Sequence, residues 1–354
     1  MQKLMIGLGI LSACQPGKPD DSASSEDSSA CIAAAVEEEG AVALLDGEGT
    51  LLAKVDLGTE VDGMAVAADV HNVQSTSDGA RVLATVMPAG DMEMEGMVEE
   101  LVIVDVAAAD VEGRVTLGED LHVAHVVTDD TLAWVTAYET DQVLEVNLEQ
   151  GEVVRTLDLP EGTGPHGLRR LPNGSGLVIA GMGDGSMHLI DLESGAVESW
   201  DLAGRAVQAG VLPDGSAAFV SDYDSRQIAR LDLGTRELSL LDLPEGAAGP
   251  VQIYPTPDSA GLWVADQGYL GEDPAGEHLY RLDTATGEVT LTATVSPAPH
   301  GVVVRADGAE VWTTTLVDGT VERVDASTGE VLSSTAVGDG PNGITCTHAG
   351  DATP

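Results

Sequence analysis

The dominant feature of this sequence is a segment with β-strand alternation that ends in Asp or Asn and recurs seven times. The copies end at Asp46, Asp105, Asn147, Asp191, Asp232, Asp283 and Asp325. In four of them a glycine follows four residues later and a second strand-like segment begins, which is typical of a β-hairpin. A further hairpin, with a turn such as Asp78-Gly79 or Asn173-Gly174, precedes six of the copies. Each unit therefore predicts four antiparallel strands in about 40–50 residues, the size of a propeller blade.

Six units are complete and the seventh is divided between the two ends of the chain. Residues 341–346 match the opening of a unit, as in residues 299–304, and the missing strands are expected at 32–36, 41–46 and 51–57. No ten-residue amphipathic helical stretch lies between the units. The sequence therefore predicts an all-β fold over residues 31–354, a seven-bladed β-propeller of four-stranded antiparallel blades whose terminal strands share one blade. Sharing a blade removes the exposed edges of an open array.

Two cysteines fall on the predicted closing blade. Matching blade seven onto blade six places Cys346 at the position of Val304 and Cys31 near that of Glu310, which are neighbours across a tight hairpin. We therefore expect a Cys31–Cys346 disulfide in an oxidising compartment. The alternative is a pair of buried thiols.

The first thirty residues indicate export. Residues 1–13 contain Lys3 and a short apolar run, too short for a permanent membrane span and typical of a signal peptide. The sequence Leu11-Ser12-Ala13-Cys14 resembles the lipobox of bacterial lipoproteins, which implies lipidation of Cys14; an ordinary secretory peptide with a chance cysteine is the alternative. Residues 14–30 are rich in Pro, Ser and acid and predict a flexible tether. The resemblance implies anchoring in the bacterial cell envelope, and the absence of Asp after Cys14 favours the outer membrane.

Charge narrows the range of partners. The chain has 60 acidic against 15 basic residues, a net charge of −45, so nucleic acid and anionic membrane surfaces are expected to repel it. Membrane contact is expected through the lipid anchor only. Apolar residues make up 43% of the chain, which argues against a disordered acidic tail.

Residues 165–179 (PHGLRRLPNGSGLVI) followed by 188–197 (HLIDLESGAV) resemble the YVTN-type repeats of seven-bladed propellers, and the resemblance extends over roughly residues 61–346. It implies architecture more than activity, because that architecture carries lactonases, streptogramin lyases, dehydrogenase heavy chains, copper reductase domains and pure adhesion or scaffold modules.

Histidines at one repeated position form the main candidate site. Counting eight residues back from the second turn residue of the first hairpin gives one position per blade, at the start of the innermost strand. This position holds His71, His122, His166 and His300, and Asn342 is its counterpart in the split blade. Four converging imidazoles suit Cu, Zn or Fe, but a small-ligand site or a structural plug of the channel fits the same pattern. His125 is expected to point away from the channel, and the acidic surroundings are expected to raise the histidine pKa values.

Two loops, residues 88–100 and 267–278, are longer than their counterparts and are expected on the same face as the histidines. The first contains Met92, Met94 and Met97, whose thioethers suit Cu(I), although a flexible loop with exposed methionines is the simpler interpretation. Aspartates in the equivalent loops could bind Ca²⁺ or merely form turns. They are Asp184, Asp222, Asp224, Asp266 and Asp318.

No familiar catalytic motif occurs in the chain. The sequence therefore favours an envelope-anchored binding or interaction module that presents one face to a small ligand, a metal ion or a protein partner. The alternative is a metal-dependent propeller enzyme of the lyase or lactonase type that uses the histidines.

Overall fold

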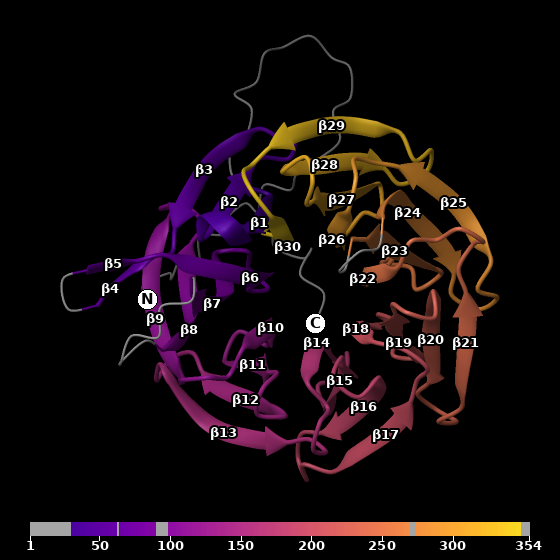
Figure 1. Cartoon of the computed structure of the whole chain (residues 1–354), viewed down its shortest axis with the longest axis horizontal. Helices are drawn as coiled ribbons and strands as arrows, with labels where there is room; N and C mark the ends of the chain where they lie inside the picture. The colour runs from indigo at the N-terminus through magenta and orange to yellow at the C-terminus, as the bar shows by residue number, and fades with distance from the viewer. Residues whose placement is uncertain (1–29, 62–63, 90–97, 270–273, 348–354) are drawn as a thin grey trace, which may run out of the picture.

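The computed structural model describes residues 30–61, 64–89, 98–269 and 274–347. Cys14, the rest of the predicted tether up to residue 29 and the methionines Met92, Met94 and Met97 lie outside these ranges. Seven four-stranded antiparallel sheets stand around a central channel, which confirms the predicted seven-bladed propeller (Figure 1). No helix within these ranges has the length and apolar character needed to cross a membrane.

Each blade runs from an inner strand to an outer one, and blades 1 to 6 are continuous in sequence. Blade 1 is β6 (Ala68–Ser75), β7 (Arg81–Pro88), β8 (Glu99–Asp105) and β9 (Asp110–Gly118). Blade 2 is β10 (Val123–Thr128), β11 (Leu132–Ala137), β12 (Gln142–Asn147) and β13 (Glu152–Asp158). Blade 3 is β14 (Pro165–Arg170), β15 (Gly176–Gly181), β16 (Ser186–Asp191) and β17 (Val197–Asp201).

The next three blades repeat this order. Blade 4 is β18 (Ala206–Val211), β19 (Ala217–Asp222), β20 (Gln227–Asp232) and β21 (Leu238–Asp242). Blade 5 is β22 (Pro250–Pro255), β23 (Gly261–Gly268), β24 (Ala275–Asp283) and β25 (Val289–Thr294). Blade 6 is β26 (Pro299–Val304), β27 (Glu310–Thr315), β28 (Thr320–Asp325) and β29 (Val331–Ala336).

Blade 7 closes the ring with strands from both ends of the chain. Its order is β3 (Leu51–Asp56), β2 (Ala41–Leu45), β1 (Ile32–Val36) and β30 (Pro341–Cys346), as predicted. A short 3₁₀ turn, η1 (Glu37–Glu39), joins β1 to β2. A two-stranded ribbon, β4 (Thr59–Val61) and β5 (Met64–Val66), lies on the path from blade 7 to blade 1 (Figure 1).

Burial explains the strand order within a blade. Inner strands such as β18 are buried at every residue, whereas the outer strand β13 alternates exposed and partly buried side chains along most of its length. Most of the apolar core lies between neighbouring blades; in one cluster Trp134 and Leu157 of blade 2 pack with Leu177 and Ile190 of blade 3. Each blade therefore buries its apolar faces against its neighbours, and closure through blade 7 covers the faces that blades 6 and 1 would otherwise expose.

The closing blade contains both predicted cysteines, and both side chains are buried. The antiparallel register pairs Ile32 with Cys346, while the backbone N–H of Thr347 donates to the carbonyl of Cys31. The residue directly opposite Cys346 is therefore Ile32 and not Cys31. The structure records no disulfide between the two cysteines. The disulfide stays a prediction.

Candidate functional site

The channel is lined at one mouth by two successive residues from each inner strand. The pairing of the first and second strands shifts register near the start of every inner strand, for example between Pro165 and Leu168 in β14. Such a bulge turns two consecutive side chains toward the same side. The first position holds His71, Ala124, His166, Val207, Val251, His300 and Asn342. The second holds Asn72, His125, Gly167, Gln208, Gln252, Gly301 and Gly343.

Blade 2 departs from the predicted register. The turn between β10 and β11 has three residues, 129–131, whereas the turn between β14 and β15 has five, 171–175. The rule of counting eight residues back from the second turn residue therefore reaches a position two residues too early in blade 2. The true counterpart of His166 is Ala124, and His125 occupies the second position, where its backbone N–H donates to the hydroxyl of Thr136.

The placements of His122 and His125 were therefore both wrong. His122 precedes β10, is exposed, has a left-handed φ of 49° and lies beside the ring of Tyr138, with 5.6 Å between ring centroids. His125 is fully buried and faces the channel. The shortened turn exchanges one histidine for the other in the cluster.

His71, His125 and His166 form a compact cluster. One nitrogen of each ring lies within 4.8 Å of the others, and the cluster draws on blades 1, 2 and 3. The ring centroids are 5.2 Å apart for His71 and His166 and 4.7 Å apart for His125 and His166. Within the described residues this is the one group of three or more His, Cys, Asp or Glu side chains with metal-ligating geometry.

The hydrogen bonds of His71 and His166 determine which nitrogens carry protons. Nδ1 of His166 lies 2.9 Å from the carbonyl of Val207, so it must donate. Nδ1 of His71 lies 3.2 Å from Oε1 of Glu37, an acceptor when ionised. Each neutral ring then presents the lone pair of Nε2, and these two Nε2 atoms face each other at 3.2 Å. Two lone pairs at this distance repel unless a proton or a metal ion lies between them.

Glu37 is the functional residue that the sequence analysis missed. It belongs to η1, where its carboxylate bonds His71 and accepts a hydrogen bond from Nδ2 of Asn342 at 2.7 Å. Burial alone would raise the pKa of Glu37, but the hydrogen bonds with His71 and Asn342 outweigh it and lower the pKa to about 2. The repeated histidine position lies on the inner strands, whereas this acid lies in the loop between the second and third strands of blade 7. The Glu37-Glu38-Glu39 run in that loop was the available signal.

His300 is separate from the cluster. Its Nδ1 lies 2.5 Å from Oε1 of Gln267, which the long β23 strand carries to the channel. Below the cluster, Nε2 of Gln208 donates to Oε1 of Gln252 at 2.6 Å and lies 3.3 Å from Nδ1 of His125. Several buried polar atoms of this lining have no hydrogen-bond partner. They are Nε2 of His125, Nε2 of Gln252, Nε2 of His300 and Oδ1 of Asn342.

The pKa values of the buried channel histidines are shifted opposite to the prediction. Burial, reinforced by neighbouring imidazoles, lowers the pKa of His166 to about 3 and that of His300 to about 4. The same causes hold the pKa of His125 well below its ordinary value. Desolvation exceeds the attraction of the acidic surface, because the exposed carboxylates are screened by water. At neutral pH these three rings are uncharged, which is the form that binds metals.

Two of the loop aspartates show the kind of structural partner that a turn residue has. Asp266 accepts backbone N–H groups of Ala248 and Gly249, and Asp224 forms an ion pair with Arg205. His188 is buried among Ser186 and Ser199, as expected for a structural histidine.

No protein-family model matches the chain, and no curated protein matches it by sequence. Solved structures with the same fold include virginiamycin B lyase from Staphylococcus aureus, with 17% identity, a TM-score of 0.63 and coverage of 80% of this chain and 92% of that one. Hydrazine synthase from Kuenenia stuttgartiensis has 15% identity, a TM-score of 0.64 and coverage of 82% and 96%. A candidate 6-phosphogluconolactonase from Bacteroides fragilis has 12% identity, a TM-score of 0.68 and coverage of 92% and 99%. At these identities the likeness shows the fold alone.

Proposed function

We propose that this protein is an envelope-anchored propeller whose channel mouth binds a transition-metal ion through His71, His125 and His166. The observation that carries the proposal is the 3.2 Å approach of the Nε2 atoms of His71 and His166, two rings whose Nδ1 atoms are held by Glu37 and Val207. A cation between the two nitrogens relieves the repulsion. Two nitrogens about 2.0–2.1 Å from Zn²⁺ at the tetrahedral angle lie about 3.3 Å apart, close to this spacing.

The chemistry of the site favours Zn²⁺ or Cu²⁺ over Ca²⁺. Neutral imidazoles are borderline-soft nitrogen ligands, whereas Ca²⁺ takes hard oxygen ligands. Glu37 would act through His71, as carboxylates do that orient metal-bound histidines in other sites. Three protein ligands leave a coordination position for water or a small molecule.

The envelope location is part of the same proposal and rests on the signal-like segment, the Cys14 motif and the acidic tether. A lipid-anchored propeller in an oxidising compartment would meet metal ions and small solutes directly, which suits a binding module. Detection of a diacylated Cys14 by mass spectrometry of the intact protein would support it. An unmodified N-terminus created by cleavage elsewhere would refute it.

Metal titration tests the site directly. Chelator-treated protein titrated with Zn²⁺ or Cu²⁺ in a calorimeter should bind one ion per chain. His166→Ala and His125→Ala should each weaken binding about tenfold or more, because each loses a ligand. His122→Ala is the matched control and should bind as the wild type does. Failure of the wild type to bind, or equal weakening in His122→Ala, would overturn the proposal.

A metal-dependent lyase or lactonase is the second candidate, favoured by the Glu37–His71 pair at the mouth. Lyases and a candidate lactonase occur among the proteins of this fold, but the pair itself is the relevant observation. A carboxylate fixed beside an imidazole can position that imidazole for proton transfer. If turnover of lactone or ester substrates is found, Glu37→Gln should lower kcat while the ion remains bound. Full activity in Glu37→Gln would exclude this role.

A further inference from the structure

Three blades carry a tryptophan at the third residue of their second strand, namely Trp134, Trp263 and Trp312, and each is buried. In blade 2 the indole N–H of Trp134 donates to Glu145 at 3.0 Å, and in blade 6 that of Trp312 donates to Glu310 at 3.3 Å. In blade 5 the indole nitrogen of Trp263 is buried without a hydrogen-bond partner. The protein's own repeats therefore show that this position normally has a carboxylate acceptor.

Both positions that supply the acceptor have changed in blade 5. The residue opposite the tryptophan is Glu145 in blade 2 and Arg281 in blade 5. The first residue of the second strand is Glu310 in blade 6 and Gly261 in blade 5. Arg281 lies over Gly261, where an added Cβ would come within 2.8 Å of its Nε.

The loss of the carboxylate also affects Arg281, because the equivalent arginine of blade 6 is bonded to Glu310. In blade 6, Arg323 lies opposite Trp312 and bonds Glu310 through Nε and one terminal nitrogen, at 2.9 and 2.6 Å. Among the described residues, Arg281 has no carboxylate partner bonded in this way, and its charge acts at longer range on Asp258 and Asp283, whose pKa values it helps to lower. Blade 5 thus offers an indole N–H and a guanidinium at the place where its neighbour holds a carboxylate.

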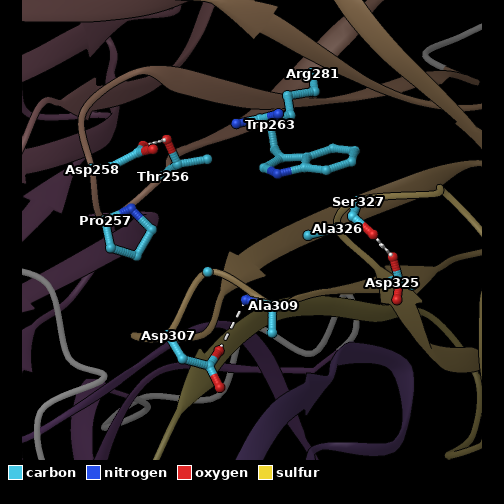
Figure 2. A pocket seen from close by; sticks show the side chains of 11 residues that line it. Thr256, Pro257, Asp258, Trp263, Arg281, Asp307, Ala309, Asp325, Ala326 and Ser327 are labelled. Atoms are coloured by element: carbon cyan, nitrogen blue, oxygen red, sulfur yellow. Dashed lines mark hydrogen bonds between the residues drawn. The ribbon is translucent and has the colours of Figure 1, made fainter.

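These two donors line a hollow of about 440 Å³ between blades 5 and 6. Figure 2 shows Trp263 between Arg281 and the Asp325–Ser327 turn, with its indole nitrogen on the side of the hollow. The opposite walls are the turns that carry Asp258, Asp307 and Asp325. Hydrogen bonds from Ser327 and Thr328 lower the pKa of Asp325 to about 2, and Thr256 and Ala260 lower that of Asp258. The rim is therefore anionic at neutral pH.

We propose that this groove binds a small zwitterion of the amino-acid type, with its carboxylate on Trp263 and Arg281 and its ammonium among the three aspartates. A simple anion would meet three carboxylates, and a simple cation would leave the two donors unfilled. A molecule with both charges can place its carboxylate on the two donors and its ammonium group on the aspartates. The volume of the hollow is within the range of small-molecule sites. Trp263 is fully buried and Arg281 is partly buried, so binding requires side chains at the opening of the hollow to shift.

The indole N–H resonances provide a direct test. The chain has four tryptophans, so a ¹⁵N-labelled sample gives four indole signals. Titration with L-lysine should move the Trp263 signal, while Trp134 and Trp312, already bonded to carboxylates, serve as internal controls. Sodium acetate offers only a carboxylate and propylammonium only an ammonium group, so each should bind about tenfold more weakly than L-lysine or not at all.

Two variants separate the site from general effects. Arg281→Gln should weaken L-lysine binding about tenfold or more, since it removes the charged donor. Gly261→Glu places a glutamate where blade 6 has Glu310, so the protein itself should supply the missing carboxylate. The Trp263 signal should then shift in the absence of L-lysine, and L-lysine binding should be abolished. A Trp263 signal that does not respond to L-lysine, an unchanged affinity in Arg281→Gln, or equal binding of acetate would overturn the proposal. His166→Ala should leave this binding intact, which distinguishes it from the channel site.

Discussion

Acid should unfold the metal-free propeller above the pH range in which its carboxylates titrate. His125, His166 and His300 are buried, and all three have folded-state pKa values below 6.5, at about 3 for His166 and about 4 for His300. As the pH falls below 6.5, the unfolded chain binds three protons that the folded chain does not. Stability is therefore complete above pH 6.5 and declines toward the folded pKa values.

The magnitude follows from the proton count. Each histidine that is protonated only in the unfolded state costs about 1.4 kcal/mol of stability per pH unit. Three such residues give a slope of about 4 kcal/mol per unit, and a loss of about 6 kcal/mol between pH 7 and pH 5. Domains of ordinary stability have about 5–15 kcal/mol in total, so the propeller should be marginal at pH 5.

Urea unfolding followed by tryptophan fluorescence, on chelator-treated protein at half-unit steps from pH 7 to pH 5, measures this slope. His166→Gln should reduce the slope by about one third, because one of the three protons is no longer taken up. His122→Gln, at the exposed position, should leave the slope unchanged. A free energy of unfolding that is flat across this range, or an unaltered slope in His166→Gln, would refute the assignment of neutral buried histidines.

Other predictions concern the connections of the ring. Glu99 is buried and accepts three backbone N–H groups of the segment that enters blade 2, at 2.6–2.8 Å. Glu99→Ala should therefore lower the free energy of unfolding by about 3 kcal/mol, whereas Glu112→Ala, which removes an exposed ion pair, should change it by less than about 1 kcal/mol; equal effects in urea titrations would contradict this. If Cys31 and Cys346 form a disulfide in the exported protein, alkylation in denaturant without reductant should label neither, and labelling of both would exclude the bond.

The repeat pattern predicted the architecture well because hairpin chemistry is local. Asx and glycine turns mark each hairpin, and seven copies leave few alternatives to a ring of blades. The split closing blade followed from matching residues 341–346 to an inner strand, and the pairing of β1 with β30 confirms it. Architecture of this kind depends on residues within one hairpin of each other.

The candidate site was predicted less well because it depends on turn length and on burial. A turn shortened by two residues moved His122 out of the channel and brought His125 in. Glu37 reaches the site from a loop, where periodicity gives no signal. The direction of the histidine pKa shifts depends on desolvation, which follows from packing across three blades and not from the number of nearby acids.

The way the chain enters the closing blade determines which mouth of the channel lies beside the first described residue. β1 begins at Ile32 opposite Cys346, the end of β30, whereas Asn342 at the start of β30 lies with Glu37 at the histidine mouth. Residue 30 therefore leaves the ring at the far mouth. The turns that form the Trp263 groove lie at this same far mouth. The two candidate sites therefore open at opposite ends of the ring, so a large partner docked on one mouth would leave the site at the other mouth accessible.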